Sequence, residues 1–204
     1  TQSPAATLSN SELAFKTAYA ASSWDVSVSA FKGYNHMPEY FLASTGGTLL
    51  APVFTIAPTF HKQSAVGGDF SRAFESTILR AESAYVWTEN RDGANPLIQP
   101  SHWDAVVGVE KPFFTDFRVQ AQLMWRLFHA YRPADQATGS NAVEASVNQR
   151  IAATNALLLN YQDPFRSLLT FRIGYNDPSL IWDAEVFTVF NFQGRDSLIS
   201  PKAS

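Results

Sequence analysis

Three features are scarce in this chain of 204 residues: cysteine, charge and long apolar runs. The absence of cysteine excludes structural disulfides, thiolate metal sites and cysteine nucleophiles. Charged residues make up 16% of the chain, well below the roughly 25% of a typical soluble domain. The formal net charge of −3 provides no basic excess to neutralise phosphates, which argues against a nucleic-acid partner. No stretch approaches the ~18 consecutive apolar residues that a transmembrane helix needs.

The chain is instead rich in aromatic residues and in alternation with a period of two. Aromatics make up 14% and hydrophobic residues 46% of the sequence. The clearest alternation covers residues 117–127, where Leu123 and Trp125 belong to an apolar set and Gln120, Gln122 and Arg126 to a polar set. A period of two places the two sets on opposite faces of a strand. The run is as long as the ~9–11 residues with which a tilted strand crosses a bilayer.

The same alternation predicts strands along most of the chain. Counted together, the segments give about nine strands and the start of a tenth. The predicted strands are 12–19, 24–30, 54–61, 77–87, 103–110, 117–127, 169–176 and 182–191, with a weaker one at 155–161 and another that begins at Ser197.

The predicted links between strands alternate in length. Residues 21–23, 111–115, 162–166 and 193–196 form tight turns, whereas 34–48, 88–101 and 132–154 are long. Residues 62–69 are intermediate, and 176–179 form a short member of the long set. Short turns at one end and long loops at the other are typical of outer-membrane barrels. In the long outer loop 132–154, Val143, Val147 and Ile151 recur every four residues and predict a short helix, either outside the membrane or folded into the lumen.

Aromatic residues gather toward both ends of the predicted strands. Such bands correspond to the interfacial girdles of membrane barrels, although aromatics also favour strands in general. The predicted long-loop band is Trp87, Trp103, Trp125, Tyr131, Tyr175 and Trp182, and the predicted short-turn band is Tyr19, Trp24, Phe113, Phe114, Phe117, Tyr161, Phe190 and Phe192. We predict that the lipid-facing set includes Trp24, Trp87, Trp103, Leu123, Trp125, Tyr175 and Trp182.

The polar sides of the strands carry charges of both signs. We predict that they line a lumen, where they either set solute selectivity or brace the wall. Mixed signs argue against a strongly anion- or cation-selective channel. The predicted pore-lining residues are Arg80, Glu82, Asp104, Glu110, Arg118, Gln120, Gln122, Arg126, Arg172, Asp183 and Glu185.

These patterns together predict an all-β fold, an antiparallel up-and-down transmembrane β-barrel in which residues 1–204 form one domain or a section of one. The alternative is a soluble β-sandwich or barrel. Low charge, strand length and loop asymmetry favour the membrane fold. The predicted topology begins outside the membrane and stops early in a strand that rises from the periplasm. Bacterial single-chain barrels have an even number of strands and both chain ends in the periplasm, so we expect an internal section of a larger barrel.

Several short stretches resemble an uncharacterised proteobacterial outer-membrane porin-like family. They are Thr7 to Glu12, Trp24 to Tyr34 (WDVSVSAFKGY), Asn155 to Phe165 (NALLLNYQDPF) and Trp182 to Leu198. The resemblance implies a large barrel in the bacterial outer membrane, a chain longer than this one, and no settled substrate.

No arrangement of residues in the sequence points to catalysis. The chain has no nucleophile elbow, zinc-protease motif or phosphate-binding glycine loop, and its histidines (His36, His61, His102 and His129) are scattered. We therefore expect no enzyme, no metal and no cofactor. The predicted function is a porin-like channel for small polar or amphipathic solutes, with outer-membrane lipid and further strands or chains as partners. The alternative is a structural barrel that anchors a surface layer or a partner complex.

Overall fold

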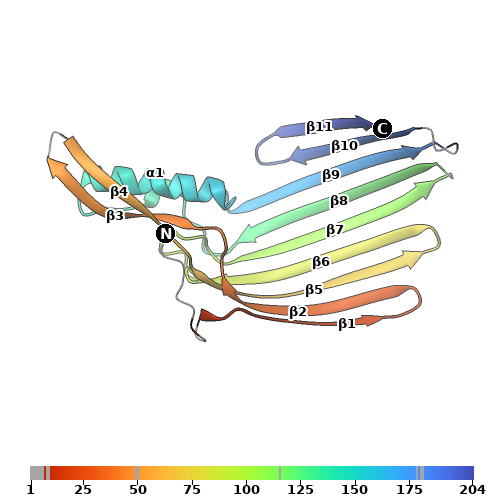
Figure 1. Ribbon diagram of the computed structural model, residues 1–204, viewed down its shortest axis with the longest axis horizontal. Coiled ribbons are helices and arrows are strands. Elements are labelled where there is room, and N and C mark those ends of the chain that lie inside the picture. The colour runs from red at the N-terminus through yellow and green to blue at the C-terminus, as the bar shows by residue number, and fades with distance from the viewer. Residues whose placement is uncertain (1–6, 8–9, 49–50, 115, 178, 180–181) are drawn as a thin grey trace.

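The computed structural model describes residues 7, 10–48, 51–114, 116–177, 179 and 182–204 and is built mainly from antiparallel β-strands. Nine of them form the main sheet, in the order β1-β2-β5-β6-β7-β8-β9-β10-β11 (Figure 1). Their bounds are Leu13–Ala20 (β1), Trp24–Tyr34 (β2), Lys62–Phe74 (β5), Thr77–Thr88 (β6), His102–Phe113 (β7), Phe117–Phe128 (β8), Phe165–Asn176 (β9), Asp183–Asn191 (β10) and Asp196–Ala203 (β11). The all-β, antiparallel part of the fold prediction is therefore confirmed.

Every neighbouring pair in the main sheet is antiparallel. This is the expected arrangement wherever a short turn joins two strands. Residues 21–23 join β1 to β2, and 114–116 join β7 to β8. Both turns lie at the places that the sequence predicts, although Thr115 is outside the described residues. We call the end of the sheet with these turns the turn end, and the opposite end the long-loop end.

The long-loop end carries a second β-unit and the helices. β3 (Glu39–Thr48) and β4 (Ala51–Thr59) form a separate two-stranded sheet. The link 129–164 contains the 3-10 helix η2 (Ala134–Gln136) and the helix α1 (Ala142–Leu158). Asn141 caps α1 by accepting a hydrogen bond from the backbone N–H of Glu144. The hairpin and α1 extend past the strand ends of the main sheet (Figure 1), and α1 packs against β3 and η2.

The two faces of the main sheet differ sharply. Directly paired residues of antiparallel strands share a face, so the register extends the two sets of β8 across all nine strands. The apolar face includes Val28, Val107 and Leu123, which remain 52%, 47% and 41% exposed. Within the described ranges, no helix or other strand packs across this face.

Most of the buried apolar side chains lie at the long-loop end. Phe128, at the end of β8, packs with Ala156, Leu159 and Tyr161, and Tyr131 lies against this cluster. The rings of Phe128 and Tyr161 meet edge to face at 6.1 Å. The loops therefore form a packed cap, while no described helix or strand covers either face of the main sheet.

Four expectations about the strands are wrong. Residues 155–161 do not form a strand, because α1 continues to Leu158 and Asn155 lies inside it. Residues 62–69 are not a link but the first part of β5. The predicted loop 34–48 contains β3. The strand predicted at 54–61 is confirmed as β4, but it pairs with β3 outside the main sheet. The long link between β8 and β9 is also wider than the predicted 132–154.

The extra strand at 155–161 reversed the predicted direction of everything after it. β9 begins at the long-loop end and finishes at the turn end, where Tyr175 pairs with Phe117. Residues 162–166 thus belong to the long-loop end. Tyr175 and Trp182, predicted for the long-loop band, lie at the turn end, and Phe190 and Phe192 lie at the opposite one.

The main sheet is open within the described residues, with β1 and β11 as its two edges. Both edge strands run from the long-loop end to the turn end. A closed barrel is therefore not formed by these strands alone.

Candidate functional site

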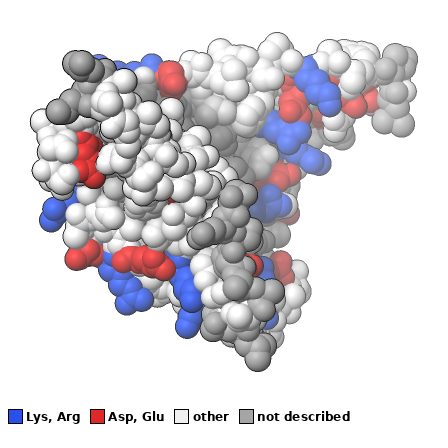
Figure 2. Space-filling model, turned by 60° about the vertical axis from the view of Figure 1, so that its left-hand side comes forward, with Lys and Arg blue, Asp and Glu red and all other residues white. Residues whose placement is uncertain are grey.

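The predicted pore-lining residues all lie on the polar face of the main sheet. The register pairs Arg80 with Gly108, Glu110 with Gln120, and Gln120 with Arg172, which links four strands in one continuous surface. Figure 2 shows charged side chains beside a hollow in the molecule and along its lower edge, next to broad areas that carry none. The structure thus brings the predicted residues onto one face.

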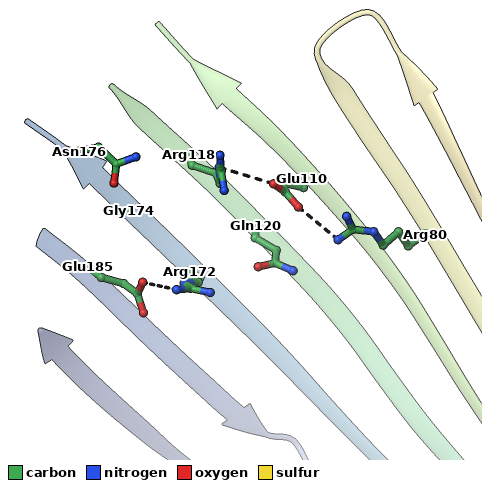
Figure 3. A pocket seen from close by; sticks show the side chains of 8 residues that line it. All are labelled: Arg80, Glu110, Arg118, Gln120, Arg172, Gly174, Asn176 and Glu185. Atoms are coloured by element: carbon green, nitrogen blue, oxygen red, sulfur yellow. Dashed lines mark hydrogen bonds and ion pairs between the residues drawn. The ribbon is translucent and has the colours of Figure 1, made fainter. Parts of the chain in front are cut away.

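A recess of about 260 Å³ lies on the turn-end half of this face. Its walls come from β6, β7, β8, β9 and β10 (Figure 3). The lining residues are Arg80, Glu110, Arg118, Gln120, Arg172, Gly174, Asn176 and Glu185. Gly174 and Asn176 are the members that sequence reasoning missed, because a glycine and a strand-end amide give no signal in an alternation of charge.

Two carboxylates hold the arginines of this recess. Glu110 accepts a hydrogen bond at Oε2 from Arg80 Nη1 at 3.2 Å, and its Oε1 lies 3.5 Å from Arg118 Nε. Glu185 pairs with Nη2 of Arg172. All three arginine side chains are about half exposed or more, so these pairs contribute little to stability. Their effect is to hold guanidinium groups toward the recess.

A stronger ion pair stands nearer the long-loop end of the polar face. Arg126 donates to both carboxylate oxygens of Asp104, at 2.5 and 2.7 Å, in the bidentate geometry that fixes both side chains. His102 Nε2 lies 3.8 Å from the same carboxylate. The polar face therefore contains a braced region as well as the recess.

The sequence prediction missed another polar cluster, on β1, β2 and β5. Asp69 lies 3.2 Å from Lys16 Nζ and accepts a hydrogen bond from the hydroxyl of Ser27. Asp69 pairs across the sheet with the predicted pore-lining Glu82. Val66, Phe70 and Phe74 occupy even positions of this strand and could have signalled its apolar side. Gly67 and Gly68 obscure the period of two, because they carry no side chain.

The predicted lipid-facing residues lie on the apolar face or beside it. Trp87, Trp103 and Trp125 form a band toward the long-loop end, where the rings of Trp103 and Trp125 meet edge to face at 6.2 Å. At the turn end, Trp24 contacts Tyr19 at 5.3 Å. Tyr175 there contacts both Phe117 and Trp182, at 4.8 and 5.1 Å. Tryptophan and tyrosine thus flank an apolar middle.

The charged residues of the apolar face, among those that the structure describes, are Lys32, Lys62, Arg72 and Lys111. Each lies close to the end of its strand. Arg72 covers the ring of Phe74 at 4.3 Å, and Lys111 that of Phe113 at 5.3 Å. Long basic side chains at such positions reach away from an apolar surface with their charged ends.

Buried polar side chains hold the cap at the long-loop end together. Asn155 of α1 is fully buried and bonds to both backbone groups of Tyr40 in β3, accepting at 2.9 Å and donating at 3.0 Å. It also donates to the carbonyl of Leu97 at 2.9 Å. The side-chain amide of Asn155 therefore satisfies the two backbone groups of Tyr40 that would otherwise pair with a further strand.

A carboxylate–imidazole–carboxylate row lies beside this contact. Glu39 is 2% exposed and accepts a hydrogen bond from the backbone N–H of Gln99 at 2.7 Å. Its Oε2 lies 3.5 Å from His61 Nε2, and His61 Nδ1 lies 2.6 Å from Glu89. Desolvation raises the pKa of Glu39 from 4.5 to about 7, against the lowering effects of Gln99 and His61.

This raised pKa predicts that the cap loosens as the pH increases. The folded cap binds the Glu39 proton more tightly than the unfolded chain does, so the stabilisation is complete below pH 4.5 and is lost as the pH rises through about 7. The loss approaches roughly 3 kcal/mol. Hydrogen exchange of β3 and β4, corrected for intrinsic rates, should accelerate between pH 5 and 8. Glu39→Gln should remove most of this pH dependence, and an unchanged profile in the variant would refute the assignment.

Among the described residues, no group of three or more His, Cys, Asp or Glu side chains is arranged to hold a metal ion. In the same part of the chain, no helix is both long enough and apolar enough to cross a membrane. No protein-family model matches the chain, and no curated protein or solved structure is detectably similar to it.

Proposed function

We propose that this chain forms part of the wall of a porin-like β-barrel in a bacterial outer membrane, and that small polar solutes pass along its polar face. The observation that carries the proposal is the exposed apolar face of the main sheet. Its middle includes Val28, Val107 and Leu123, tryptophan and tyrosine lie toward both ends, and its charges are basic residues near strand ends. This is the order of side chains that a barrel presents to hydrocarbon, interface and headgroups.

The large accessible surface of the chain indicates that another layer covers part of it. Its accessible surface is 13214 Å², whereas a compact monomer of its 22.5 kDa exposes roughly 9,500 Å². Soluble monomers rarely expose a contiguous apolar patch above roughly 600 Å². Lipid would cover the apolar face of all nine strands at once and leave the polar face in water.

The edges of the sheet specify how such a barrel closes. Since β1 and β11 run in the same direction, direct pairing between them would be parallel. Antiparallel closure therefore requires an odd number of further strands between these edges, from the same chain or from another. The total is then even, as in bacterial single-chain barrels.

A second candidate function is a barrel that anchors a surface layer or partner complex. The observation in its favour is the packed cap, in which α1, the β3–β4 hairpin and the link 89–101 are joined through Asn155 and Gln99. A rigid projection of this kind suits a docking platform.

Conductance separates the two functions. Purified native protein inserted into a planar lipid bilayer should give stepwise, ohmic current in potassium chloride if it forms an open channel. Protein that is demonstrably inserted, by protease protection in liposomes, but carries no current would contradict the channel and favour the anchoring barrel.

A further inference from the structure

We propose that the recess around Arg118 is a binding site for small oxyanions, either carboxylates or phosphate. The proposal rests on the proposed function only in that solutes reach the recess through the lumen. It deepens that function by naming the class of solute that the wall would retain.

The charge balance of the recess favours an anion. Its lining contains the guanidinium groups of Arg80, Arg118 and Arg172 and the carboxylates of Glu110 and Glu185. One positive charge is therefore left over. Two further charges lie just outside the recess: Lys202, which pairs across the strands with Glu185, and Asp183, which pairs with Asn176. The positive charge of Lys202 and the negative charge of Asp183 offset each other.

The arginines keep N–H donors for which the described residues provide no acceptor. Each guanidinium carries several N–H groups in a planar fork that matches carboxylate and phosphate oxygens. The recorded ion pairs occupy Nη1 of Arg80 and Nη2 of Arg172. Arg118 is 66% exposed and approaches Glu110 only through Nε, at 3.5 Å. Its two terminal nitrogens are therefore the best placed to hold an added oxyanion.

A glycine leaves the space for such a ligand. Gly174 of β9 pairs with Arg118 of β8 and lies on the same face. A Cβ atom added at Gly174 would meet no atom within 4 Å, so the position beside Arg118 is open (Figure 3). The amides of Gln120 and Asn176 border this space and supply further polar contacts.

The test is calorimetric titration of the whole protein in detergent micelles with succinate, acetate and phosphate, and with chloride as the halide comparison. We expect the three oxyanions to bind more tightly than chloride, and Arg118→Gln to weaken their binding about tenfold. Gly174→Val should weaken it as well, because the added side chain fills the open space. Tighter binding of phosphate than of acetate would identify phosphate as the preferred class, and the reverse order would identify carboxylates.

Two matched variants serve as controls. Arg166→Gln removes an arginine from the same face of β9 but outside the recess, and Gly46→Val adds a side chain at a glycine of β3 with equal free space. Neither should change oxyanion binding. Equal affinity in the wild type, Arg118→Gln and Gly174→Val, or no preference over chloride, would overturn the site.

Conductance measured on the same preparation distinguishes a failure of the oxyanion site from a failure of the proposed channel. Current without oxyanion binding would leave the channel standing and refute the site. Oxyanion binding that is lost in Arg118→Gln, in protein that carries no current, would support the site and refute the channel.

Discussion

Leu123→Arg should destabilise the membrane-inserted protein by about 2–4 kcal/mol, the cost of a cation at mid-depth on the lipid face of a barrel. Leu123 lies in the middle of β8, on the apolar face, and is 41% exposed. Its side chain pairs with Val107 on one side and Leu169 on the other. In the proposed barrel, an arginine there would have no carboxylate in its row and would face hydrocarbon.

Gln122→Arg is the matched control, one residue away on the polar face. Gln122 pairs with Gly108 and Thr170, two small neighbours beside which a longer side chain can extend along the polar face. We expect a change of less than about 0.5 kcal/mol, as for substitutions on a solvated surface. The measurement is reversible urea unfolding in lipid vesicles. Equal costs for the two variants would contradict the assignment of the two faces.

Asn155→Ala should have the second-largest effect, and it should be confined to the cap. The substitution removes three hydrogen bonds and leaves both backbone groups of Tyr40 and the carbonyl of Leu97 without this partner in a buried site. Each unsatisfied buried group costs about 1–3 kcal/mol. The hairpin of β3 and β4 should therefore separate from α1, while the main sheet keeps its pairing.

Hydrogen exchange followed by mass spectrometry detects this local opening. Protection should fall in β3 and in the second half of α1 and remain unchanged in β7 and β8. Asn148→Ala, in the same helix, is the control, because it removes one exposed hydrogen bond to Thr138. A uniform loss of protection across the main sheet would show that the cap is not a separate unit.

The parts of the fold that could be predicted from the sequence are the strands with large apolar residues. β7 and β8 alternate Trp, Val and Leu with charged residues, and their predicted antiparallel turn is confirmed. β5 was missed because Gly67 and Gly68 interrupt its alternation with residues that have no side chain to signal a face. Residues 155–158 carry the run Asn-Ala-Leu-Leu, which has no period of two and continues α1.

The polar face could be predicted, but the recess could not. Alternation places Arg80, Glu110 and Arg118 on polar sides of their own strands, and the structure shows that they share one face. Which of them meet depends on the register, which brings Glu110 between Arg80 and Arg118. The aromatic bands could be predicted only in part. Tyr175 was correctly placed near a strand end, but at the wrong end of the sheet, because one false strand reverses the direction of all later ones.

Spin labelling along β8 is the most direct test of the central claim that the apolar face of the main sheet meets lipid. The chain has no cysteine, so single cysteines introduced at positions 119 to 126 can be labelled selectively without removing others. In lipid vesicles, labels at 119, 121, 123 and 125 should be accessible to oxygen, which concentrates in hydrocarbon, and shielded from a water-soluble nickel chelate. Labels at 120, 122, 124 and 126 should show the reverse, with a period of two. Odd-numbered positions that are shielded from both reagents, as under a covering protein layer, or exposed to the nickel chelate would contradict the account.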